Sequence, residues 1–381
     1  MGDGSEIYNV RLALVGKELE VMEEVNVEVT DGVITHIGKG FNSRGRDFRT
    51  GIMMPALVNA HVHSADFSFP EAGIDKPIAE VVGDPNSLKY FMLKGLTPQK
   101  VAEGIFKFLE YSKSIGVRTV IDFREQDILG SKIAREVKER VKGLTYVILG
   151  RLDGELREER LLKLSKFADG YGVPSMSGHN EDELKSIGKI FKGKIVAVHF
   201  AETLKQGLRD SLDQVISSLR PNAIVHGTNL FFDDFLHLRE HGISVVACPR
   251  SNMWFSVGIP RIDEMIESGV NLLLGTDNGA WVSPDVWKEM ETALLITRLR
   301  RPMSNFSREV LKAATTNVDA LSIRNYLEEG NRASFVIVEG ERSGIFNAKD
   351  LYTGIIKRGN NVLYSRGNPE YQRSPVFPGG L

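Results

Sequence analysis

Two histidines separated by one residue, His61 and His63, follow the apolar run of residues 55–60. On an extended strand, residues i and i+2 point to the same face, so both imidazoles can reach one metal ion. A pair of this kind also arises by chance in a chain with eight histidines. The pair therefore indicates half of a metal site only if further ligands follow elsewhere in the chain.

Four further polar side chains follow short apolar runs in the same way. They are His199, Glu202, His226 and Asp277, and each lies at or just after the end of a segment that we predict as a strand. One such histidine alone is more often a structural residue, but the coincidence of several indicates a common site. The remaining histidines fall in a hairpin, a loop or helices, namely His36, His179, His237 and His241.

A repeating order of strand, loop and helix begins near residue 52 and positions these groups. After the strand that ends at His63, we predict strands at residues 118–123, 145–152, 170–175, 194–200, 223–227, 244–248 and 271–275. Helical stretches separate them, for example residues 98–114, 181–191, 204–219 and 233–241. Short units of this kind force parallel strands, so we predict an α/β fold, a (β/α)8 TIM-like barrel whose strand ends face the active site. The alternative, an open doubly wound sheet, requires a glycine-rich phosphate turn that the sequence lacks.

The two ends of the chain have the pattern of a small sheet. Alternating residues on either side of Asp31-Gly32 predict a hairpin, and strands are predicted at residues 333–339, 351–357 and 361–364. These strands are too few to be stable alone. We therefore predict a small discontinuous β-sandwich domain from residues 1–52 plus 330–381, around a barrel of residues 53–329. Residues 374–380 are predicted to be a loose arm.

Composition excludes several classes of protein. A chain of 381 residues with 42% hydrophobic content and a formal charge of -2 is typical of a globular protein without affinity for nucleic acid. We find no apolar run of about 18 residues and no secretion signal, so we expect a cytoplasmic protein without membrane contact. The single cysteine, Cys248, excludes an internal disulfide and a cysteine-rich zinc site, and we interpret it as a packing residue. Any metal must be held by histidines and carboxylates.

Five motifs in this order and spacing resemble the amidohydrolase superfamily. They are residues 55–63, His199-x-x-Glu202, His226-Gly227, Cys248-Pro249-Arg250-Ser251-Asn252 and Gly275-Thr276-Asp277-Asn278. The likeness is greatest to the mononuclear branch, which contains cytosine, guanine and adenosylhomocysteine deaminases and triazine chlorohydrolases. Binuclear members use a carbamylated lysine at the end of strand four, and residues 170–178 contain no lysine, so one divalent metal ion is favoured.

The resemblance implies a role for each matching residue. His61, His63, His199 and Asp277 would hold the ion, for which zinc is favoured and iron is the alternative. Glu202 would shuttle protons and, with His226 and Asp277, would act in catalysis. Three neutral imidazoles and one carboxylate leave a bound divalent ion with net positive charge, which makes hydroxide available near neutral pH.

The expected activity is that of an aminohydrolase acting on a nucleobase-like or other amino-substituted ring. Activated water would attack an sp² carbon, Glu202 would protonate the neighbouring ring nitrogen, and ammonia would leave. One alternative is hydrolysis of a cyclic amide-like C–N bond, as in imidazolonepropionase-like relatives, or hydrolytic dehalogenation on the same site. A further alternative is a non-catalytic binding member of the fold. The partner is then a small-molecule substrate, and the resemblance also allows a homodimer.

Residues on the loops after the strands are candidates for substrate contact. Ser251 and Asn252 would either order their loop or bind substrate, and Arg250 would meet an anionic group or form a structural bridge. Aromatic side chains could form the walls for a flat ring or anchor the loops, and these are Phe67, Phe69, Trp254 and Trp281. The charged pairs Arg124-Glu125 and Arg151-Asp153 would either contact the substrate or pair with each other. The segment 64–96 would act as a lid or form a dimer contact.

Overall fold

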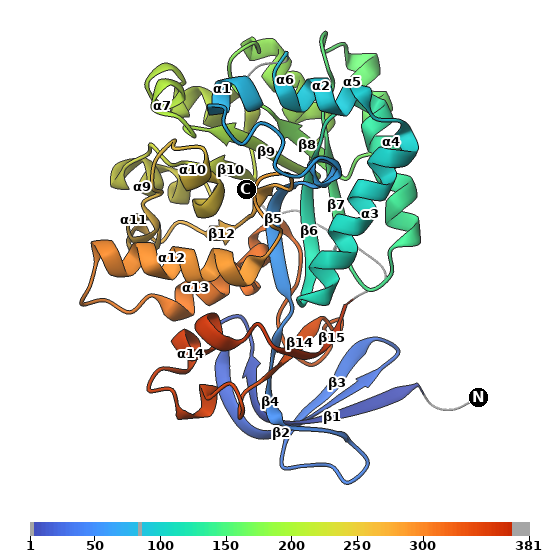
Figure 1. Cartoon of the computed structure of the whole chain (residues 1–381), viewed down its shortest axis with the longest axis vertical. Coiled ribbons are helices and arrows are strands. Elements are labelled where there is room, and N and C mark those ends of the chain that lie inside the picture. The colour runs from blue at the N-terminus through green and yellow to red at the C-terminus, as the bar shows by residue number, and fades with distance from the viewer. Residues whose placement is uncertain (1–3, 83–85, 368–381) are drawn as a thin grey trace, which may run out of the picture.

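The computed structural model of the chain describes residues 4–82 and 86–367 and contains two sheets (Figure 1). The predicted arm at residues 374–380 lies outside the described residues. The larger sheet contains β5 (Leu57–His63), β6 (Val117–Arg124), β7 (Thr145–Gly150), β8 (Gly170–Val173), β9 (Ile195–Phe200), β10 (Ala223–His226), β11 (Ser244–Ala247), β12 (Leu272–Leu274) and β13 (Asp277–Asn278).

The larger sheet closes into the predicted barrel. Its strands are parallel and follow the order β12-β11-β10-β9-β8-β7-β6-β5-β13. β12 and β13 are two parts of the eighth strand, separated by Gly275 and Thr276. β12 pairs with β11, the seventh strand, and β13 pairs with β5, the first, so the eighth strand closes the barrel. The TIM-like prediction is confirmed.

Apolar side chains from alternate positions fill the barrel. The interior cluster contains Val58, Ala60, Ile121, Phe123, Val147, Leu149, Ile195, Ala197, Ala223, Val225, Val246, Cys248 and Leu273. Because side chains alternate across a strand, the positions between these residues point outward to the helices. The packing role predicted for Cys248 agrees with its complete burial inside this cluster.

Helices surround the barrel (Figure 1). They are α1 (Ile78–Val81), α2 (Leu88–Gly95), α3 (Pro98–Ser114), α4 (Asp127–Arg140), α5 (Glu158–Leu164), α6 (Glu181–Ile190), α7 (Leu204–Arg209), α8 (Leu212–Gln214), α9 (Phe232–Glu240), α10 (Pro249–Trp254), α11 (Ile262–Ser268), α12 (Val286–Arg300) and α13 (Ser307–Ala313), with short turns η1 (Ser64–Ser68), η2 (Val215–Leu219) and η3 (Thr316–Leu321). The Thr97 side chain caps α3 and Pro98 occupies its first turn, which explains why the predicted start is correct. None of the described helices is long and apolar enough to cross a membrane.

The helix predicted at residues 204–219 is divided into three pieces. α7 ends before Asp210, which has extended backbone angles, and the Ser211 side chain then accepts a hydrogen bond from the Gln214 amide to start α8. A π-helical turn, η2, completes the segment. The apolar periodicity continues across the break, but the chain changes direction at the capping serine.

Strands from both ends of the chain form the second sheet, below the barrel in Figure 1. Its six strands in spatial order are β15 (Val362–Arg366), β14 (Phe335–Glu339), β4 (Arg46–Pro55), β1 (Ser5–Val15), β2 (Glu20–Thr30) and β3 (Val33–Lys39). Asp31 and Gly32 form the predicted hairpin turn, with φ values of 50° and 76°. β4 leads almost directly into β5, so this sheet fixes the start of the strand that carries His61.

The strand predicted at residues 351–357 is wrong, because these residues form helix α14 (Leu351–Arg358), which follows the short turn η4 (Ile345–Asn347). The Asp350 side chain accepts a hydrogen bond from the Thr353 amide and caps the helix. Ile355 and Ile356 are buried, while Lys357 and Arg358 lie in the last turn, where cations interact favourably with the helix dipole. The cap and the terminal charges outweigh the strand propensity of the isoleucines.

Candidate metal centre

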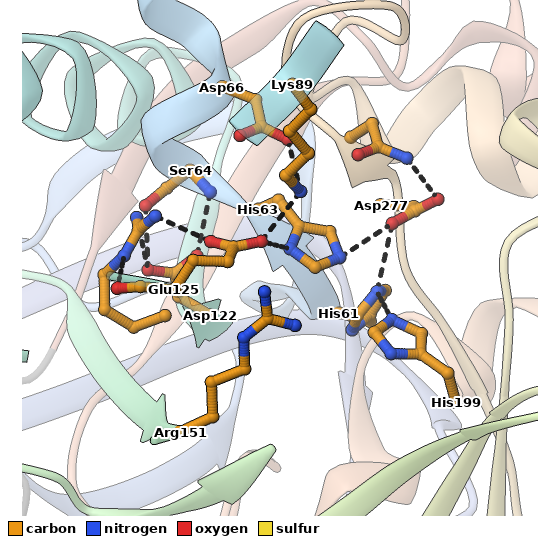
Figure 2. Close-up of polar contacts among 12 residues, drawn as sticks. His61, His63, Ser64, Asp66, Lys89, Asp122, Glu125, Arg151, His199 and Asp277 are labelled. Carbon is orange, nitrogen blue, oxygen red and sulfur yellow. Dashed lines mark hydrogen bonds and ion pairs between the residues drawn. The ribbon is translucent and has the colours of Figure 1, made fainter. Parts of the chain in front are cut away.

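Donor atoms of four side chains predicted as metal ligands converge at the mouth of the barrel (Figure 2). His61 Nε2 lies 3.1 Å from Asp277 Oδ1 and 3.2 Å from His199 Nε2. His63 Nε2 lies 3.3 Å from the same Asp277 oxygen. The residues come from β5, β9 and β13, which the closed barrel places together although His61 and Asp277 are 216 residues apart.

These spacings suit a single divalent ion. A tetrahedral zinc ion with bonds of about 2.0–2.1 Å has donor atoms roughly 3.3 Å apart along each edge of the tetrahedron. The three measured separations, 3.1, 3.2 and 3.3 Å, agree with that edge. The Nε2 atoms of His61 and His199 also face each other at 3.2 Å without an intervening carboxylate, an arrangement in which both nitrogens could bind one cation.

The pKa shifts of His61, His199 and Asp277 suit metal ligands. Burial lowers the pKa of His61 to about 3 and lowers the pKa of His199 well below its usual value. Burial acts in the opposite direction on Asp277, but its hydrogen bond with His61 and the nearby imidazoles hold the pKa of this carboxyl well below its ordinary range. Neutral imidazoles beside an ionised carboxylate offer lone pairs to a cation.

The Asp277 carboxylate is fixed by two donors. The Ser251 hydroxyl donates to Oδ2 over 2.6 Å, and the Asn278 amide donates to the same oxygen over 2.9 Å. Oδ1 is thereby left to face the imidazoles. Asp277 also has a φ of 59°, a left-handed conformation that is costly for a non-glycine residue and is typical of functional sites.

Gly275 allows the close approach of the eighth strand to the first. A Cβ atom at this position would lie 2.7 Å from the His61 Cβ and 2.8 Å from its backbone nitrogen and oxygen. Only glycine has no atom there, so the placement of Asp277 beside His61 depends on Gly275.

His226 belongs to the same buried group but differs in its hydrogen bonding. Donor atoms of His61, His199, His226 and Asp277 all lie within 4.8 Å of one another, a set that could hold a metal ion. The Asn252 amide nitrogen, however, lies 3.1 Å from His226 Nδ1. Because the amide nitrogen donates, Nδ1 accepts, so a neutral His226 carries its proton on Nε2. In this tautomer His226 Nε2 would donate a hydrogen bond.

Glu202 lies next to His226 at the edge of the cluster. Its Oε1 is 3.7 Å from His226 Nε2, and its side chain is 14% exposed. Burial raises the pKa of Glu202 above its usual value. A carboxyl group that keeps its proton closer to neutral pH can donate that proton to a bound substrate.

Most of the remaining candidates for substrate contact are engaged with the protein. Arg250 donates to the Ser283 and Asp285 carbonyls and lies 3.4 Å from Glu289, as expected of a structural bridge. The Trp281 indole donates to the Ala72 carbonyl over 2.7 Å. The Phe67 ring contacts Phe108 and Tyr111, and Trp254 is 43% exposed on α10. Ser251 and Asn252 contact the site through Asp277 and His226, as described above.

Sequence reasoning missed the buried charges behind His63. Glu125 accepts from His63 Nδ1, with Oε1 2.5 Å away, and it also lies 2.7 Å from Lys89, whose side chain enters from α2. Burial opposes ionisation of Glu125, but Lys89, His63 and Arg124 hold the pKa of Glu125 well below its usual value. The predicted mutual pairing of Arg124 with Glu125 is present at 2.7 Å. Lys89 lies in the largely apolar run of residues 88–93, and nothing in that run indicates which partners a buried lysine would have.

A family model described as the amidohydrolase family matches residues 52–363, most of the chain. The chain belongs to the amidohydrolase family. It is 35% identical, over 92% of its length and 94% of the relative, to a "putative aminohydrolase" of Methanothermobacter thermautotrophicus. It is 24% identical to the 5-methylthioadenosine/S-adenosylhomocysteine deaminase of Shouchella clausii, covering 95% of this chain and 93% of that one.

A solved structure shares the fold of this amidohydrolase. An adenosine deaminase from Xanthomonas campestris with bound zinc superimposes with a TM-score of 0.80, 18% identity, and coverage of 96% of this chain and 93% of the other. At this identity the likeness concerns the fold, and it includes both the barrel and the smaller sheet by its coverage. The expected family and fold are confirmed.

Proposed function

We propose that this amidohydrolase is a metal-dependent aminohydrolase that releases ammonia from an amino-substituted ring, with 5′-substituted adenosines as the first candidate substrates. The observation that carries the proposal is the convergence of His61, His199 and Asp277 beside two groups suited to proton transfer, Glu202 and His226. Relatives named as deaminases of methylthioadenosine, S-adenosylhomocysteine and 5′-deoxyadenosine support the choice of substrate class.

The proposed ligands are His61, His63, His199 and Asp277, and they would hold one ion. Zinc is the first choice because imidazole nitrogens and one carboxylate suit it, and iron is the alternative. A divalent ion supplies hydroxide near neutral pH, since it lowers the pKa of water from about 15.7 to roughly 7.

The proton chemistry belongs to Glu202 and His226. Burial raises the pKa of Glu202, which suits this carboxyl to deliver a proton to the ring nitrogen next to the attacked carbon. His226 presents Nε2–H, fixed by Asn252, to stabilise negative charge that develops on the substrate. The two groups lie 3.7 Å apart and can therefore act on neighbouring atoms of one ring.

Ammonia release would test the proposal directly. Protein loaded with zinc would be incubated with adenosine, 5′-deoxyadenosine, methylthioadenosine, S-adenosylhomocysteine, guanine and cytosine, and ammonia and ring products would be measured. Deamination of at least one purine is expected. A ring-opened product without ammonia would instead favour the cyclic amide hydrolase, and a protein with no affinity for zinc or iron would contradict the metal site itself.

The homodimer and the cytoplasmic location remain parts of this proposal that the resemblance and composition support. Sedimentation velocity on the metal-loaded protein tests the first, and cell fractionation tests the second.

A further inference from the structure

Lys89 is a buried lysine on a helix outside the barrel strands. It lies in the second position of α2, within the segment between β5 and α3, and is 2% exposed. Its ammonium group lies 2.8 Å from Asp66 Oδ2 and 2.7 Å from Glu125 Oε1 (Figure 2). A buried lysine is rare unless it is paired, so these two ion pairs fix α2 to Asp66 and Glu125.

Glu125 connects this ammonium group to the candidate metal centre. Its Oε1 accepts from both Lys89 and His63 Nδ1, while its Oε2 lies 2.7 Å from Arg124. The carboxylate is therefore held by a cation on each oxygen. An imidazole that donates from Nδ1 has its lone pair on Nε2, and His63 Nε2 is the atom that lies 3.3 Å from Asp277.

We propose that Lys89 is a positioning residue of the metal centre, which acts through Glu125 to hold His63 in the orientation and tautomer that bind the ion. The inference rests on the proposed metal site. It gives the segment 64–96 a part in that site, where the sequence left only a lid or a dimer contact as its roles.

The ammonium group holds Glu125 by direct contact in a pocket that contains a second buried carboxylate. Asp66 and Glu125 are both almost completely buried, and Lys89 lies between their carboxylates. Without Lys89, two buried carboxylates would face each other without the cation between them. Glu125 would also lose its direct contact on Oε1, whether or not Asp66 is charged, and the acceptor of His63 Nδ1 would then be held only by Arg124.

The neighbouring residue strengthens the docking of α2. The Tyr90 hydroxyl accepts a hydrogen bond from Arg151 over 2.8 Å, and the Arg151 guanidinium lies 5.4 Å from the Tyr90 ring centroid. Successive residues of one helix thus contact charges at the ends of β6 and β7. The helix cannot shift without breaking both contacts, so the position of Lys89 is well defined.

The substitution Lys89→Met tests the proposal, because it removes the charge and keeps the length of the side chain. We expect zinc affinity, measured by chelator competition on the metal-free protein, to fall about 10–100-fold. The visible spectrum of the cobalt-substituted protein should also change, since it reports the ligand geometry. Lys94→Met is the matched control, as Lys94 is exposed on the same helix, and it should leave both measurements unchanged.

A double variant separates positioning from simple charge balance. Asp66→Asn combined with Lys89→Met removes one buried charge of each sign, so it should fold, as circular dichroism and a cooperative thermal transition would report. If Lys89 positions Glu125, zinc affinity stays low and the cobalt spectrum stays altered. Full recovery of both in the double variant would overturn the proposal, as would unchanged affinity in a folded Lys89→Met protein. Absence of metal binding by the wild-type protein would instead contradict the proposed function.

Discussion

The Asn252 amide nitrogen lies 3.1 Å from Nδ1 of His226, and this contact decides which nitrogen of the imidazole carries the proton. Both residues are almost completely buried. With Nδ1 as the acceptor, Nε2–H points to the site as a donor. The strand-six histidine is thereby distinguished from the three other histidines of the cluster, whose Nε2 atoms face Asp277 or each other.

Replacing Asn252 with Asp should reverse this arrangement. A carboxylate accepts where the amide donated, so His226 would be protonated on Nδ1 and would no longer present a neutral Nε2–H donor. We expect kcat to fall about 10–100-fold while the zinc content is unchanged, because removing an oriented donor costs transition-state stabilisation. Steady-state kinetics with metal analysis would measure both. Asn347→Asp, at an exposed position, is the control, and equal kcat values in the two variants would refute the assignment.

Replacing Glu202 with Gln should abolish most of the turnover and leave the metal bound. The amide has the shape of the carboxyl but cannot deliver a proton, and general acid catalysis is worth about 10²–10⁴ in rate. The expected loss lies in kcat rather than KM. Ammonia release and zinc content would be measured beside Glu181→Gln, which changes an exposed carboxylate paired with Lys185. A near-normal rate would remove Glu202 from the mechanism.

Replacing Gly275 with Ala should weaken metal binding. The added methyl carbon would lie 2.7 Å from the His61 Cβ and 2.8 Å from its backbone, so β5 and the eighth strand would have to separate. We expect zinc affinity to fall at least tenfold, together with a loss of stability of about 1–3 kcal/mol from overpacking. Chelator competition and denaturant unfolding would test this. Gly95→Ala, where the added carbon meets open space, should change neither quantity.

Glu289 should make the stability of the protein depend on pH. Burial raises its pKa to about 8, far above the value of about 4.5 expected in the unfolded chain. Between these values the folded state retains a proton that the unfolded state has lost, so stability is fully present below the unfolded pKa and falls as pH rises towards 8. The loss is of the order of 1 kcal/mol per pH unit.

The substitution Glu289→Gln isolates this contribution. We expect the free energy of unfolding, measured in denaturant at pH 6 and pH 8, to vary less with pH in the variant than in the wild-type protein. Glu291→Gln on the same helix serves as the control. Parallel pH profiles for the wild-type protein and Glu289→Gln would show that Glu289 is ionised when folded.

The convergence of the ligands was predictable from the sequence because a barrel places the carboxyl ends of its strands at one mouth. Short apolar runs located His61, His199 and Asp277 at those ends, and closure of the barrel brings the ends together. Lys89 was not predictable, because its burial depends on where a helix between two strands docks, which local pattern does not encode. The same holds for Arg250, whose partner Glu289 lies 39 residues further along the chain. The error at residues 351–357 arose because Ile355 and Ile356 suit a strand and a buried helix face equally well.

The division of the eighth strand links the candidate metal centre to the closure of the barrel. β13 pairs only with β5, the first strand of the barrel, and β12 pairs with β11, the seventh. The barrel is therefore closed at this side by a strand of only two residues. A cation bound by both His61 and Asp277 would hold β5 and β13 together, although the two residues are 216 positions apart in the chain. Ligand release would then loosen the closure of the barrel first, and hydrogen exchange at Asp277 and Asn278 would rise before that of β7 or β8.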